Sequence, residues 1–248
     1  MSLDKTVVIE LGAPSGLDST GLSRLASCLH QRVMAGQRVV AVVSPPMWRG
    51  VKDLEASERL GAAADGHARA MLVGSGAIDT AQRLAGILAD RGVRVARVNA
   101  EKTAVVTRGH PLDAQPRHAS ARFFATALQR ADIVIVPAGV GVDDYGRATH
   151  LGENAGALTA LFLADAFGLP VELSQSLGGS SIGARKARLF ARDRGILYAV
   201  DDASRSVGAK PGVSAGWGQR RRVVSHPSGD SPRIGTDLSG ENRMAASA

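Results

Sequence analysis

The sequence has little cysteine, few aromatic residues and no long apolar run. Its single cysteine, Cys28, excludes an intramolecular disulfide and any cysteine-cluster metal site. Aromatic residues make up 4% of the 248 residues, too few for a surface that stacks nucleic-acid bases. No apolar stretch reaches the roughly 20 residues that a membrane-spanning helix needs. These absences argue against a disulfide scaffold, a membrane protein and a specific nucleic-acid reader.

The net charge of +7 comes mostly from arginine. The arginines are scattered along segments of helical periodicity, which is typical of a solvated surface; the one local cluster is Arg220–Arg222. Residues 1–5 (MSLDK) lack the basic flank and apolar core of a signal peptide. We therefore expect a cytoplasmic protein in which Cys28 is a reduced core residue.

Short β-branched runs alternate with segments of helical spacing along the first 200 residues. This alternation predicts a mainly parallel sheet covered by helices on both faces, a three-layer α/β/α sandwich. The expected strands are residues 7–11, 39–43, 93–98, 104–106, 133–136, 171–173 and 197–200. The expected helices are residues 18–36, 53–90 with breaks near Gly61, Gly66 and Gly74–Gly76, 119–130, 154–167 and 183–194. Residues 140–146 are expected to form a hairpin turn.

Two segments resemble signatures of the aspartokinases, members of the amino-acid kinase family. Residues 7–15 (VVIELGAPS) resemble the family's first strand with its lysine and Gly-Gly-Ser-Ser loop. Residues 149–157 (THLGENAGA) resemble its Thr-Thr-Leu-Gly-Arg-Gly-Gly-Ser-Asp loop. Further segments agree in order and spacing. The resemblance implies an amino-acid kinase-like domain over residues 1–202. Residues 203–248 lack periodicity and are expected to form a disordered polar tail.

The residues that carry chemistry in aspartokinases are replaced here. Glu10 stands at the position of the first-strand lysine, and Glu153 at that of the substrate-binding arginine. Residues 171–181 run from a strand directly into a helix, with no counterpart of the family's nucleotide-binding stretch. Phosphoryl transfer needs cations around the dispersed negative charge. We therefore expect a degenerate homologue that is not an ATP-dependent aspartate kinase and binds or converts a small amino-acid-derived metabolite without a cofactor.

Ligands of a parallel sheet bind at the carboxyl ends of its strands, which directs attention to a small set of residues. Glu10, Glu153 and His150 are the candidate catalytic residues. The alternatives are an arginine ion pair for Glu10, a favourable helix-dipole position for Glu153, and an exposed loop position for His150. The candidate substrate-binding residues are Gly12, Ser15, Ser44, Arg108, Thr149, Gly152 and Asn154.

Two other functions stay open. The first is a divergent ATP-dependent amino-acid or carboxylate kinase, with MgATP as cofactor and with Arg108, Arg185 or Lys186 supplying the missing charge. The second is a non-catalytic partner subunit of an active paralogue. The expected partners are a small metabolite and either a second copy of the chain or a related subunit; neither a metal, a membrane nor a specific nucleic acid is expected.

Overall fold

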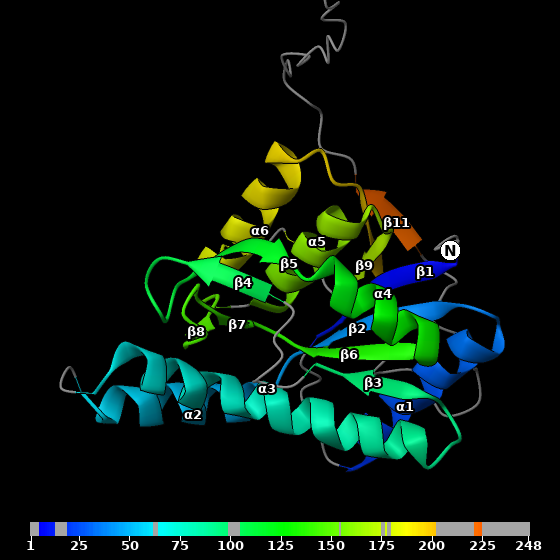
Figure 1. Cartoon of the computed structure of the whole chain (residues 1–248), viewed down its shortest axis with the longest axis horizontal. Helices are drawn as coiled ribbons and strands as arrows, with labels where there is room; N and C mark the ends of the chain where they lie inside the picture. Colours follow the sequence, from blue (N-terminus) through cyan, green and yellow to red (C-terminus); the bar gives the residue numbers. More distant parts are fainter. Residues whose placement is uncertain are drawn as a thin grey trace, which may run out of the picture.

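The computed structural model describes residues 5–12, 19–61, 64–98, 105–153, 155–174, 177, 180–201 and 221–224. Within them the chain forms two β-sheets (Figure 1). The larger sheet has seven strands in the order β11-β10-β9-β1-β2-β6-β3. Its strands are β1 (Thr6–Leu11), β2 (Arg38–Val43), β3 (Val95–Arg97), β6 (Ile133–Pro137), β9 (Val171–Leu173), β10 (Tyr198–Asp201) and β11 (Arg221–Val224). All neighbours pair in parallel except β10 and β11.

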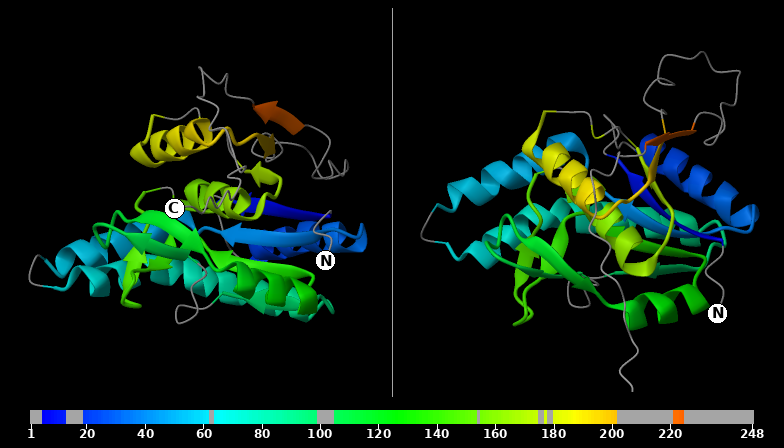
Figure 2. Two further views of the ribbon diagram at one scale, coloured as in Figure 1. Left: turned by 45° about the horizontal axis from the view of Figure 1, so that its top comes forward. Right: turned by 90° about the horizontal axis from the view of Figure 1, so that it is seen from above.

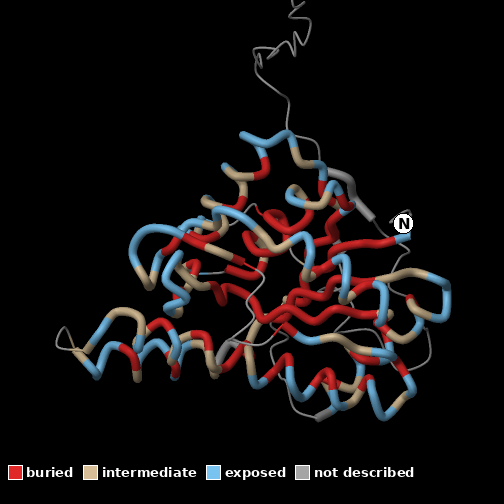
Figure 3. Tube along the Cα trace, in the orientation of Figure 1, coloured by how far each residue is buried: buried red, intermediate tan, exposed pale blue. Residues whose placement is uncertain are grey.

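Helices cover both faces of this sheet (Figure 2). One face carries α1 (Ser19–Met34) and α3 (Gly66–Ala89), with α2 (Met47–Arg59) packed along α3. The other carries α4 (Ala121–Arg130) and α5 (Ala155–Phe167), and α6 (Ile182–Asp193) packs on α5. Strand β1 alternates between the two cores: Val7, Ile9 and Leu11 face α1 and α3, whereas Val8 faces α5. The predicted α/β/α sandwich is confirmed, and its central strands β1, β2 and β6 are almost completely buried (Figure 3).

A smaller four-stranded sheet, in the order β5-β4-β7-β8, lies beside the larger one. Its strands are β4 (Val105–Arg108), β5 (Gln115–Ala119), β7 (Val140–Val142) and β8 (Ala148–His150). The hairpin expected over residues 140–146 is the β7–β8 connection. Strand β5 was not expected, because its sequence QPRHA is polar and shows no period-two alternation.

The break expected in the second long helix at Gly74–Gly76 is wrong, because α3 runs through these residues without interruption. The glycines serve helix packing instead. A Cβ on Gly76 would lie 2.6 Å from the Asp53 carboxylate and 2.9 Å from the Arg49 side chain, both on α2. The missing side chain therefore lets α2 approach α3 closely. Helix α2 itself begins at Met47, six residues before the predicted start at Asp53.

Part of the expected disordered tail forms a strand. Residues 221–224 (RRVV) pair antiparallel with β10, consistent with the β propensity of the two valines. The rest of the predicted tail, residues 203–220 and 225–248, lies outside the described residues. Cys28 is buried in α1, as predicted. Within the described part of the chain, no helix is long and apolar enough to cross a membrane.

Candidate functional site

Glu10 is a buried carboxylate in the central strand of the larger sheet. Its side chain lies on the α5 face, in the same layer as Val8 and Val42, and the residue is only 7% exposed. Carboxylate atom Oε2 accepts hydrogen bonds from the Ser174 backbone N–H at 3.0 Å and from the Ser174 hydroxyl at 2.5 Å. Burial raises the pKa of Glu10, and the two Ser174 bonds oppose this rise. The carboxyl group therefore resists ionisation more than an exposed glutamate does.

Glycines bring the backbone close to this carboxylate. A Cβ on Gly156, in the first turn of α5, would lie 2.5 Å from the Ser44 hydroxyl oxygen and 3.0 Å from Glu10 Oε1. A Cβ on Gly12 would collide with the Ser174 hydroxyl. The carboxyl ends of β2, β1 and β9 thus present one carboxylate and two hydroxyls to the start of α5. We call these five residues the Glu10 site: Glu10, Gly12, Ser44, Gly156 and Ser174.

One oxygen of the Glu10 carboxylate has no hydrogen-bond partner in the described part of the chain. Among the described residues no donor reaches Glu10 Oε1, and Ser174 is the only residue that hydrogen-bonds to the carboxylate. In this part of the chain Arg32 Nε alone is a fully buried side-chain polar atom without a partner. Glu10 Oε1 therefore keeps some contact with solvent.

His150 lies at the same end of α5. Its Nδ1 accepts a hydrogen bond from the Gly152 N–H at 3.2 Å, so in the neutral ring Nε2 carries the proton. Nε2 lies 2.7 Å from the point that a Cβ on Gly139 would occupy, and the Ala155 methyl is equally close to that point. Burial lowers the pKa of His150 to about 4, which makes the imidazole neutral at pH 7. The alternative of an exposed loop histidine is thereby set aside.

The turn before α5 brings a cation near the site. Gly152 has a φ of +90°, a left-handed conformation that glycine adopts without strain. A Cβ there would lie 2.5 Å from the Asp113 carboxylate and 3.7 Å from Lys186 Nζ, because Lys186 of α6 forms an ion pair with Asp113. The charge of this lysine is thus already partly neutralised.

Other predicted site residues lie elsewhere or have structural partners. Thr149 is buried in the small sheet, where its hydroxyl hydrogen-bonds to that of Thr107 at 2.7 Å. Arg108 is exposed at the end of β4, and Glu153 is exposed in the turn that precedes α5. The remaining candidates fall outside the described residues: Ser15 and Asn154.

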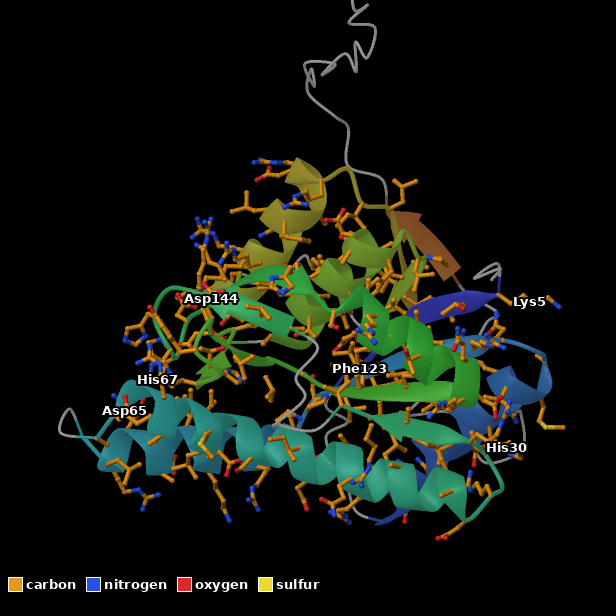
Figure 4. The ribbon with its side chains drawn as sticks, in the orientation of Figure 1. Lys5, His30, Asp65, His67, Phe123 and Asp144 are labelled. Atoms are coloured by element: carbon orange, nitrogen blue, oxygen red, sulfur yellow. The ribbon has the colours of Figure 1, made fainter. Side chains whose placement is uncertain are left out.

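The small sheet that carries His150 is fixed to α3 by a histidine. His67 Nδ1 is 2.9 Å from the carbonyl oxygen of Ala148 in β8, and Nε2 is 3.9 Å from the Asp143 carboxylate. Figure 4 shows His67 and Asp65 together at the start of α3, beneath the small sheet. This contact holds β8, the strand that carries His150, against α3.

The arginine ion pair considered for Glu10 is formed by another glutamate. Glu172 of β9 pairs in register with Ile9, so it faces α1, and it binds Arg32 with an Nη2–Oε2 distance of 2.5 Å. Both side chains are buried. The sequence did not predict this ion pair. Ser174 lies in the segment that follows the predicted strand 171–173, at a strand end where ligands are expected, but it was not among the candidate site residues.

Comparisons with known proteins support the fold. No protein-family model matches the sequence, and no curated protein matches it. Among solved structures, E. coli aspartokinase III in complex with lysine and aspartate superimposes with a TM-score of 0.66 at 17% identity, covering 79% of this chain and 62% of the enzyme. Aspartate kinase from Synechocystis gives 0.64 at 16% identity, covering 79% and 37%. Isopentenyl phosphate kinase gives 0.58 at 12% identity, covering 79% and 90%.

These likenesses establish the architecture. The chain has the amino-acid kinase fold that the resemblance implied, and it is similar in structure to aspartokinases and to isopentenyl phosphate kinase. It spans about three fifths of the length of the E. coli enzyme.

Proposed function

We propose that this protein is a degenerate aspartokinase homologue that does not phosphorylate aspartate with ATP. Instead it binds or converts a small, amino-acid-derived metabolite at the Glu10 site. The observation that carries the proposal is the buried Glu10 carboxylate, which stands where the aspartokinase resemblance places a lysine. A carboxylate at this strand end does not favour binding of a nucleoside triphosphate, which is itself negatively charged.

The repulsion between an ionised Glu10 and a phosphate group can be estimated. Two like charges about 4 Å apart repel by roughly 4 kcal/mol at an effective dielectric of about 20. If Glu10 is ionised, a phosphate at that distance would bind about a thousandfold more weakly than to a neutral site. If Glu10 is protonated, the repulsion disappears, but no cation among the described residues binds Glu10 or takes its place to stabilise the transferring phosphoryl group. Either state of Glu10 is unfavourable for a kinase.

The composition of the site favours a small polar ligand. Three oxygen-bearing side chains, Glu10, Ser44 and Ser174, lie at adjacent strand ends. The first turn of α5, with its partial positive charge, lies against them. Hydroxyl and carboxyl groups bind the amino, hydroxyl and carboxyl groups of metabolites through directional hydrogen bonds.

The test is direct. Purified protein is incubated with aspartate and MgATP, and aspartyl phosphate is detected by trapping with hydroxylamine. We expect no product above the protein-free control, both for the wild type and for Glu10→Gln. Aspartyl phosphate formed by the wild type and lost in Glu10→Gln would refute the proposal, because it would make Glu10 part of a working kinase site.

A divergent ATP-dependent carboxylate kinase is the second candidate, and the position of Lys186 favours it. This lysine lies beside the Gly152 turn that leads into α5, where a cation could reach a phosphate. Under this alternative MgATP is the cofactor. Lys186→Ala should then abolish ATP turnover with a responsive carboxylate, whereas Arg192→Ala, at an exposed arginine of the same helix, should leave it unchanged.

A further inference from the structure

Only one of the two Glu10 carboxylate oxygens accepts hydrogen bonds from the described residues. The two Ser174 donors both bind Oε2, while Oε1 has no donor among the described residues although the residue is only 7% exposed. An acceptor that has little access to water and no protein donor is unfavourable, and a molecule that supplies a donor relieves that cost. The unpaired oxygen thus points to a ligand that donates.

The neighbours of Oε1 indicate what kind of donor fits. Glu10 Oε1 and the Ser44 hydroxyl oxygen both lie against Gly156, within 3.0 Å and 2.5 Å of its hypothetical Cβ. In the described structure the Ser44 hydroxyl makes no hydrogen bond, and no lysine, arginine or histidine contacts Glu10. Both groups accept hydrogen bonds. A primary ammonium group carries three donors and one positive charge, so it can satisfy both oxygens and neutralise the carboxylate.

A hydrogen-bond donor also lies near the start of α5. Nε2 of the neutral His150 and the methyl group of Ala155, the first residue of α5, each lie 2.7 Å from the position of a Cβ on Gly139. The Nε2–H makes no hydrogen bond within the described residues. The partial positive charge at the start of α5 adds to this donor. The start of α5 therefore has a donor, His150 Nε2–H, in the vicinity of Ala155 and an acceptor, Glu10 Oε1, against Gly156.

We propose that the Glu10 site binds a small molecule with a primary ammonium group, held by Glu10 and Ser44, and with a hydrogen-bond acceptor at its other end, held by His150. This inference rests on the proposed function, since it names the ligand class of the same site. It inverts the charge preference of a phosphate-binding strand end: an ammonium group is attracted where a phosphate would be repelled.

The Glu10 carboxyl carbon reports the interaction by NMR. In protein with carbon-13-labelled glutamate, the Glu10 signal is the one absent from Glu10→Gln, and its pH titration gives the Glu10 pKa. The probes are β-alanine, propionate, which lacks only the amine, and methylammonium. We expect β-alanine and methylammonium to lower the Glu10 pKa, because an ammonium partner favours the carboxylate, and propionate to leave it unchanged or raise it.

The variants separate binding from general effects. Glu10→Gln should weaken β-alanine binding by roughly 30-fold or more, as loss of a largely buried charged partner does. The matched surface change Glu58→Gln on α2 should have no effect. His150→Asn should weaken β-alanine but not methylammonium, because only β-alanine has an acceptor end.

Two results would overturn the inference. One is a Glu10 signal that neither amine moves; the other is amine binding that Glu10→Gln leaves intact. The proposed function is tested separately, by the aspartyl phosphate assay with MgATP and aspartate. No amine effect together with no kinase activity removes the ammonium ligand alone, whereas kinase activity removes the proposed function as well.

Discussion

Acid sensitivity of the fold should be traceable to His150. Its pKa falls from 6.5 to about 4 on folding, because burial disfavours the charged ring. The folded protein therefore binds this proton less tightly than the unfolded chain does. The stabilising contribution is complete above pH 6.5 and is lost as the pH falls toward 4. A shift of about 2.5 pKa units, at about 1.4 kcal/mol each, amounts to roughly 3 kcal/mol.

The perturbation is His150→Asn, whose side-chain oxygen can replace Nδ1 as acceptor for the Gly152 N–H while removing the titratable group. Urea unfolding of both proteins across pH 4 to 7 gives the difference in free energy of unfolding at each pH. The loss of ring packing sets a constant offset. On top of it, the wild type should lose roughly 3 kcal/mol relative to the variant between pH 6.5 and 4. A difference that stays flat over this range would refute a neutral, buried His150.

Three further outcomes are expected from stability measurements in urea. Glu10→Gln should become progressively more stable than the wild type as the pH rises above 4.5, because the raised pKa of Glu10 makes its ionisation on the folded protein costly; parallel pH profiles would contradict this. Arg32→Met should cost about 3–5 kcal/mol by removing the guanidinium that neutralises the buried Glu172 carboxylate, and Arg32→Met with Glu172→Leu should recover part of that loss. Gly156→Ala should destabilise by about 1–3 kcal/mol because its methyl would meet the Glu10 carboxylate, whereas Gly86→Ala in α3, with nothing within 4 Å, should stabilise by up to about 1 kcal/mol; equal effects at the two glycines would contradict the close approach at α5.

The sequence was most informative where burial is continuous. Strands β1, β2 and β6 are β-branched runs buried on both faces, and α5 is apolar on every side, so their positions could be predicted. Strand β5 could not, because its polar residues pair only at the edge of a small sheet. The glycines of α3 led to the wrong prediction of a helix break, because a glycine that allows close helix packing cannot be told by local sequence from one that ends a helix.

Only the part of the candidate site that depends on local sequence could be predicted. A charged residue inside a buried strand marks Glu10 from sequence alone. Its partner Ser174 is 164 residues away, and only the pairing of β1 with β9 brings the two together. The exposure of Glu153 depends on the direction of a turn, which residue spacing does not specify.

Titration of MgATP by calorimetry, into the wild type and into Glu10→Lys, tests the central claim most directly. If Glu10 has replaced a phosphate-binding cation, the wild type should show no saturable heat at millimolar nucleotide. Glu10→Lys, which restores a positive charge at the strand end, should bind at least as well as the wild type and never worse. Saturable binding of MgATP to the wild type that Glu10→Lys weakens would contradict the account, because it would show that a nucleotide site operates with the glutamate in place.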